Sequence, residues 1–130
     1  MKIRKSAEDY LEAILIIEQE KGRVRSIDIA NRLGFSKPSV SIAMKQFREN
    51  GYIEVDDTGA ISLTESGKSV AANTLERHRL LTDLLISVGV SEDTAKHDAC
   101  EIEHDISAET FDKLREYAQK VAVKRNHKID

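Results

Sequence analysis

The segment 26–51 constrains the fold more than any other, because it holds two short amphipathic stretches separated by one glycine. Apolar residues at helical spacing predict a helix over 26–33, and Gly34 follows it, where a left-handed residue commonly ends a helix. Ser36 is expected to cap the next helix, and Pro38 suits its first turn, where no backbone donor is needed. Two helices joined by a short glycine-containing turn are typical of a helix-turn-helix.

Periodic segments on both sides of this pair complete a mainly helical protein. The predicted elements are helices over 6–21, 26–33 and 36–50, strands over 52–55 and 60–63, and helices over 65–88, 91–105 and 107–121. Ser6, Ser26 and Ser107 are the expected caps of their helices. The residues between the strands, Asp56-Asp57-Thr58-Gly59, favour a tight turn, so the strands form a hairpin that serves as the wing of a winged helix-turn-helix.

The charge distribution predicts different partners for two segments of the chain. The formal net charge of the whole chain is −3, which by itself argues against nucleic acid. Segment 22–50, however, carries six basic and two acidic residues, whereas segment 91–113 carries eight acidic and two basic residues. The first segment suits phosphate and the second suits a cation.

The helix after Ser36 is the expected recognition helix, which enters the major groove of DNA. Its outward residues are small or basic, so the backbone can approach DNA and the cations can neutralise phosphates. The candidate DNA-contacting residues are Arg25, Ser36, Lys37, Pro38, Ser39, Ser41 and Lys45. The alternative is a small helical bundle whose basic face is only solvated, but the turn, the cap, the hairpin and the local charge together favour DNA binding.

A second group of residues has the composition of a metal site. Cys100, Glu103 and His104 lie at positions i, i+3 and i+4 of the helix predicted over 91–105, so they share one face. Sulfur, oxygen and nitrogen donors together suit a divalent transition ion better than Ca²⁺ or Mg²⁺. Asp9 and Glu12 form a further i, i+3 pair on the first helix. Each residue also has an ordinary structural interpretation: a small core cysteine, a hydrogen-bonded histidine, or solvated carboxylates.

The whole chain resembles the DtxR/MntR family of metal-dependent repressors. The motifs that carry the resemblance, in family order, are Ser6-Ala7-Glu8-Asp9-Tyr10-Leu11-Glu12, Ile27-Asp28-Ile29-Ala30-Asn31-Arg32-Leu33, Lys37-Pro38-Ser39-Val40-Ser41, Leu63-Thr64-Glu65-Ser66-Gly67, Arg77-His78-Arg79-Leu80-Leu81 and Cys100-Glu101-Ile102-Glu103-His104. The resemblance implies a homodimer that binds palindromic double-stranded operator DNA when loaded with metal. It also implies a winged helix-turn-helix domain over 1–70 and an all-helical metal-binding and dimerisation domain over 71–130. The expected form is the short one, without the SH3-like third domain of the longer, iron-responsive members.

The resemblance further implies a metal-ligand set. Carried over position by position, the ligands are Asp9, Glu12, His78, Cys100, Glu103 and His104. Asp9 is typical of manganese-responsive members and Cys100 of iron-responsive ones, so the expected ion is Mn²⁺ or Fe²⁺, with Co²⁺ or Zn²⁺ binding in vitro. Cys100 binds through its thiolate or offers only its backbone carbonyl. Thr82 departs from the Glu often found one turn after the histidine, which weakens a second, ancillary site.

Two other functions share part of this pattern. A metal-independent winged-helix regulator that senses a small molecule would treat the acidic residues as a solvated face. A metalloenzyme would need an open coordination position and a substrate pocket, for which the chain has little room, so no enzyme activity is expected. The absence of a signal sequence or an apolar run of about 20 residues predicts a cytoplasmic protein without a membrane partner.

Overall fold

The computed structural model describes residues 5–121 and confirms a mainly helical fold with one small sheet. The elements are α1 (Lys5–Lys21), α2 (Ser26–Leu33), α3 (Lys37–Glu49), β1 (Ile53–Val55), β2 (Ile61–Leu63), α4 (Glu65–Ser87), α5 (Glu92–Ile102) and α6 (Ala108–Lys120). The chain divides into two compact units, Met1–Asn73 and Thr74–Asp130, and α4 runs through the boundary between them. Within residues 5–121, every helix is too short or too polar to cross a membrane.

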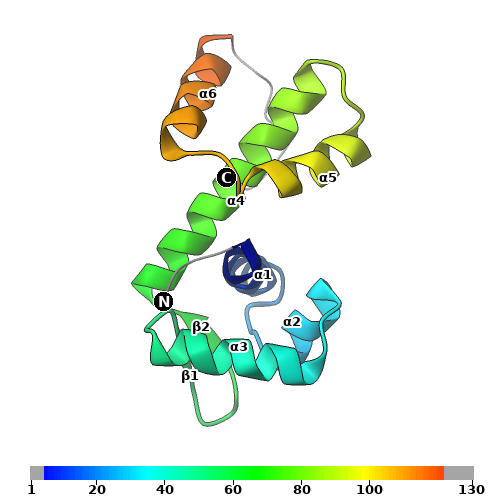
Figure 1. Ribbon diagram of the computed structural model, residues 1–130. Helices are drawn as coiled ribbons and strands as arrows, with labels where there is room; N and C mark the ends of the chain where they lie inside the picture. The colour runs from blue at the N-terminus through cyan, green and yellow to red at the C-terminus, as the bar shows by residue number, and fades with distance from the viewer. Residues whose placement is uncertain (1–4, 122–130) are drawn as a thin grey trace. The chain divides into compact units, whose positions relative to one another are not determined.

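The first unit is a winged helix-turn-helix, in which α1, α2, α3 and the β1–β2 hairpin surround one apolar core (Figure 1). Leu11 and Ile14 of α1, Ile29 of α2 and Val40 of α3 are completely buried there. Tyr10 packs edge-on against Phe47, with 5.8 Å between the ring centroids. These residues are the apolar positions of each predicted helix, so helical periodicity alone identified the faces that pack together.

The connection between α2 and α3 follows the local rules. Gly34 adopts a left-handed conformation, with φ of 70°, and its amide donates to the Ala30 carbonyl. Ser36 caps α3, because its side-chain oxygen accepts the Ser39 amide at 3.3 Å. The predicted cap at Ser26 is wrong, since Ser26 is already helical and Arg25 occupies the cap position. Asp28 provides the side-chain hydrogen bond at this helix end, because its carboxylate accepts the Arg25 amide at 3.0 Å. That hydrogen bond is the main reason why the pKa of Asp28 is lowered.

The wing is a two-stranded antiparallel hairpin in which Ile53 pairs with Leu63 and Val55 with Ile61. It is slightly shorter than predicted, because Tyr52 and Ala60 lie just outside the ladder. The Asp56 carboxylate closes the turn by accepting the Thr58 hydroxyl and amide and the Ala60 amide. These hydrogen bonds, the Thr58 hydroxyl first, lower the pKa of Asp56.

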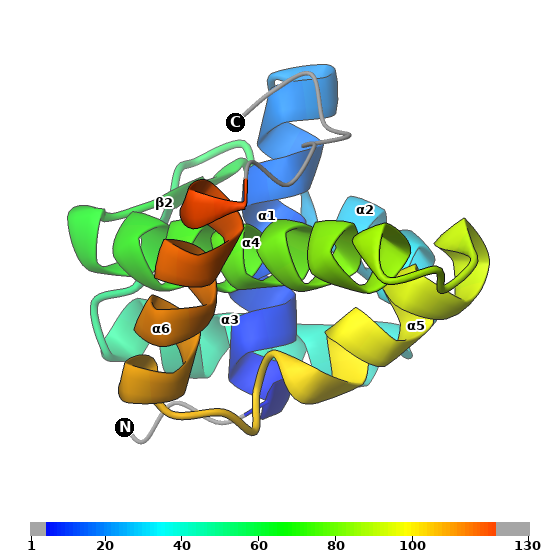
Figure 2. The same cartoon turned by 90° about the horizontal axis from the view of Figure 1, so that it is seen from above.

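The second unit consists of the C-terminal part of α4 together with α5 and α6. The views of Figures 1 and 2 place α5 beside the C-terminal end of α4 and α6 on another side of α4. Its apolar cluster centres on Leu80, Phe111 and Ala118. Ser107 caps α6 as predicted, since its side chain accepts the Thr110 amide at 3.1 Å.

Candidate metal centre and DNA-contact surface

Helix α5 ends earlier than the sequence predicts, and this changes how the metal-ligand candidates are held. The expected helix runs to residue 105, but α5 stops at Ile102. Glu103 still donates its amide to the Ala99 carbonyl, as in a continuing α-helix, so it stays near the face of Cys100. Asp105 instead donates to Ile102, three residues back, which tightens the chain into a turn over residues 103–105.

Arg77 of α4 holds this turn, and nothing in the sequence pattern identified that role. Its Nη1 donates to the carbonyls of Glu103, at 3.3 Å, and Ile106, at 3.1 Å. Its guanidinium also lies over the ring of Phe111, 5.3 Å from the centroid. Both carbonyls lie after the last residue of α5, so one guanidinium on α4 holds the chain that follows α5 in place.

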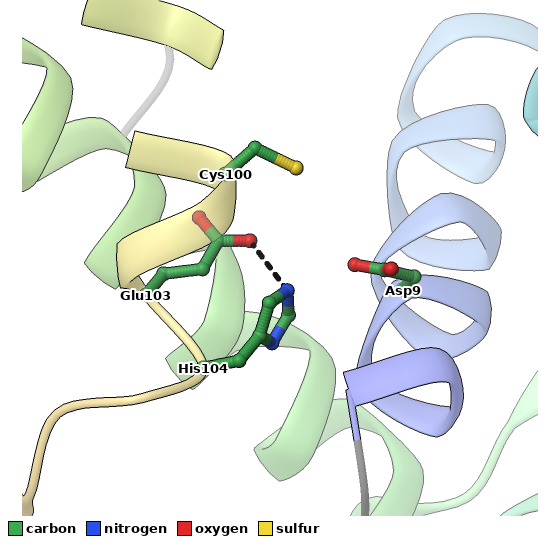
Figure 3. A group of neighbouring side chains, drawn as sticks. All are labelled: Asp9, Cys100, Glu103 and His104. Atoms are coloured by element: carbon green, nitrogen blue, oxygen red, sulfur yellow. Dashed lines mark ion pairs between the residues drawn. The ribbon is translucent and has the colours of Figure 1, made fainter. Parts of the chain in front are cut away.

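The second unit brings three of the predicted ligand residues to one place, around the end of α5 (Figure 3). One potential ligand atom from each of Cys100, Glu103 and His104 lies within 4.8 Å of the others. The Glu103 side chain is fully buried and that of His104 is 2% exposed, with 3.3 Å between Glu103 Oε1 and His104 Nε2. Burying a carboxylate is costly unless a charged partner, hydrogen bonds or a metal ion compensates.

His78 joins the same cluster from α4. Its Nδ1 donates to Glu103 Oε2 at 2.9 Å, and its side chain is 25% exposed. Metal-bound histidines commonly make such a hydrogen bond to a carboxylate through the second ring nitrogen. Thr82, one turn further along α4, is buried and donates its hydroxyl to the His78 carbonyl at 2.7 Å.

The geometry and chemistry of this cluster fit a divalent transition ion. Ligand atoms bound at about 2.0–2.3 Å from an ion can be at most roughly 4.6 Å apart, so only small side-chain movements would bring the three atoms within reach. The donors are a thiol, a carboxylate and an imidazole, the mixture that suits first-row transition metals. Asp9 and Glu12 lie one turn apart on α1, in the first unit, and both are half-buried.

All seven predicted DNA-contacting residues are exposed in the first unit. Lys37, Ser41 and Lys45 carry the polar surface along α3, and Ser41 and Lys45 line a hollow of about 180 Å³ with residues of the wing. Ser36 and Ser39 are hydrogen-bonded to each other through their hydroxyl groups, 2.8 Å apart.

Arg25 has an additional role that the sequence did not reveal. Its Nη1 donates to the Thr58 carbonyl at 2.7 Å, and Arg23 donates to the Thr58 hydroxyl at the same distance. Both arginines therefore attach the α1–α2 connection to the tip of the wing. The local alternation and turn residues predicted the wing, but they gave no sign of which distant side chain would meet it.

The comparisons with known proteins cover nearly the whole chain. Residues 2–61 match the N-terminal DNA binding domain of iron dependent repressors, and residues 64–128 match the metal binding and dimerisation domain of the same repressors. The transcriptional regulator MntR of Escherichia coli O6:H1 is 36% identical over 121 residues, which are 93% of this chain and 78% of that protein. The HTH-type transcriptional regulator MntR of Geobacillus thermodenitrificans is 33% identical, over 88% of this chain and 81% of its own length.

A solved structure shows a similarity over most of the chain as well. The metal-dependent transcriptional regulator MtsR superposes with a TM-score of 0.80 at 28% identity, over 92% of this chain. This chain spans 55% of the length of that protein.

The chain belongs to the family of iron-dependent repressors. It is a metal-dependent transcriptional regulator, with a DNA-binding domain followed by a metal-binding and dimerisation domain. The members of this family are described as transcriptional regulators and not as a class of enzymes.

Proposed function

We propose that this protein represses transcription as a homodimer that binds palindromic operator DNA when loaded with Mn²⁺ or Fe²⁺. The observation that carries the proposal is the convergence of Cys100, Glu103 and His104 on one point in a unit that follows a winged helix-turn-helix. Residues 1–70 would supply the DNA contacts, and residues 71–130 the dimer interface and most of the metal ligands. The seven predicted DNA-contacting residues, which include Arg25 and Lys45 and are all exposed, would meet the DNA.

The metal ligands in this proposal come from both units. His78, Cys100, Glu103 and His104 belong to the second unit, and Asp9 and Glu12 would complete the coordination from α1 of the first. Without an ion, the carboxylates of Asp9, Glu12 and Glu103 would repel one another. A divalent cation replaces this repulsion by shared coordination, which ties α1 to the second unit and populates the arrangement that binds DNA.

Two of these ligands favour different metals. The carboxylate of Asp9 is a hard donor that suits Mn²⁺, whereas a thiolate from Cys100 favours Fe²⁺, Co²⁺ or Zn²⁺. We propose Mn²⁺ as the first candidate and Fe²⁺ as the second. Support for Mn²⁺ comes from the MntR relatives and from the solved structure of a manganese-dependent transcriptional repressor in complex with manganese, which is 27% identical to this chain.

The direct test is DNA binding titrated with each metal in parallel. Duplexes selected from a random-sequence pool by the Mn²⁺-loaded protein serve as the operator, and binding is measured with chelator, Mn²⁺, anaerobic Fe²⁺, Co²⁺ and Zn²⁺. The expected result is an increase in affinity of about 5–150-fold with the physiological metal, the range of ordinary allosteric coupling. Equal affinity with chelator and with every metal would contradict the proposal and support the metal-independent alternative.

Replacing Cys100 by serine tests whether its thiolate binds the ion. In the wild-type protein, Co²⁺ is expected to give the intense near-ultraviolet absorption of a thiolate–metal charge transfer, and the Cys100→Ser variant is expected to lose it. The same variant should lose more affinity for Co²⁺ and Zn²⁺ than for Mn²⁺, because Mn²⁺ binding depends less on a sulfur ligand. An unchanged spectrum and unchanged metal preference would show that Cys100 contributes no thiolate.

A further inference from the structure

Ile42 is a strongly exposed apolar residue among polar neighbours on α3. The residue is 61% exposed, more than Ile27 and Phe35, the other exposed large hydrophobics in the described part of the first unit. Phe35 packs its ring edge-on against Tyr10, at 5.4 Å between centroids, so its exposure has a structural explanation. No comparable packing accounts for Ile42 in the described core of this unit.

The position of Ile42 on α3 places it at the centre of the outward face. The buried residues of α3 are Val40, Met44 and Phe47, and at about 100° per residue Ile42 lies roughly opposite them. Ser39 precedes it by three residues and Lys45 follows it by three, so both are its neighbours on the helix surface.

The surroundings of Ile42 favour DNA as the partner of this face. Lys37 and Lys45 are exposed on the same helix, and the α2–α3 region carries a local excess of positive charge. A face with basic residues around one aliphatic side chain matches the major groove, where phosphates flank the base edges.

We propose that Ile42 is a specificity-determining residue that contacts the methyl group of a thymine in the major groove. The inference rests on the proposed DNA-binding function and adds the base that this position reads. An isoleucine side chain has no hydrogen-bond donor or acceptor, so it cannot recognise the polar edges of guanine, adenine or cytosine. The C5 methyl of thymine is the apolar group that the major groove offers in unmodified DNA, and apolar side chains contact it.

The test compares thymine with deoxyuridine, which differs from it only by that methyl group. Duplexes selected from a random pool by the Mn²⁺-loaded full chain are resynthesised with deoxyuridine at one conserved thymine at a time. At the position read by Ile42, the wild-type protein is expected to lose about 4-fold in affinity, the effect of one buried methyl group. The Ile42→Ser variant is expected to bind both duplexes equally, and Ile42→Val to keep most of the discrimination.

The controls separate this inference from the proposed function. Val88→Ala removes another exposed aliphatic side chain, 76% exposed at the end of α4, and should leave the thymine preference unchanged. If wild type and Ile42→Ser lose the same affinity at every thymine while metal still increases binding, this inference is wrong and the proposed function stands. If no duplex is enriched with any metal, the proposed function fails and this inference fails with it.

Discussion

The Glu103→Gln variant is expected to lose the metal response almost completely. Glu103 is buried, and its two carboxylate oxygens lie 2.9 Å from His78 Nδ1 and 3.3 Å from His104 Nε2. Glutamine has the same size but no negative charge, so it binds a divalent cation poorly and cannot repel neighbouring carboxylates when the ion is absent. We expect metal to raise operator affinity by less than about 2-fold in the variant, against about 5–150-fold in the wild type.

Two measurements identify the cause of such a loss. Isothermal titration calorimetry with Mn²⁺ should show weakened binding in Glu103→Gln, and thermal unfolding with chelator should show that the variant remains folded. Glu101→Gln is the matched control, because it makes the same substitution at an exposed position of α5. If the Glu103→Gln protein kept the metal response of the wild type, Glu103 would not be a metal ligand.

The Gly67→Ala variant is expected to destabilise the first unit, although alanine is usually the better residue in a helix. Gly67 lies in the first turn of α4, where Thr64 accepts its amide at 3.2 Å. A methyl group at this position would meet the backbone oxygen of Tyr52 at 2.1 Å and a methyl of Leu63 at 3.1 Å. The Tyr52 carbonyl cannot simply move away, because it accepts the Thr64 amide at 3.1 Å.

The size of this effect follows from two opposing contributions. Replacing a helical glycine by alanine ordinarily stabilises by about 0.5–1 kcal/mol. Overpacking commonly costs about 1–3 kcal/mol, and the upper end applies here because the added methyl meets a hydrogen-bonded backbone carbonyl. After the gain is subtracted, we expect the free energy of unfolding to fall by about 2 kcal/mol. For a unit of this size, the thermal midpoint should fall by roughly 10 °C.

Circular dichroism measures the unfolding transition, and hydrogen exchange locates the change. Protection should be lost around Tyr52 and the start of α4, while Phe111 and its neighbours in the second unit keep theirs. Ser66→Ala is the matched control, since Ser66 is exposed on the same turn of α4 and should change the midpoint little. A Gly67→Ala protein at least as stable as the wild type would show that α4 can shift away from Tyr52 at little cost.

Features that depend on neighbouring residues could be predicted from the sequence. The order of helices and strands, the left-handed Gly34 and the caps at Ser36 and Ser107 follow from periodicity and from hydrogen bonds that span only a few residues. The spacing of Cys100 and Glu103 also placed these two residues together, because Glu103 keeps the helical backbone hydrogen bond to Ala99.

Features that depend on residues far apart in the chain arise only when the chain has folded. Helix α5 stops at Ile102 where Arg77, on another helix, donates to the carbonyls that follow, and this sets the turn that carries His104. Arg25 meets Thr58 of the wing, 33 residues away, and Gly67 is required by the carbonyl of Tyr52. Periodicity and capping describe one element at a time, so they cannot show which backbone or side chain a second element will bring against it.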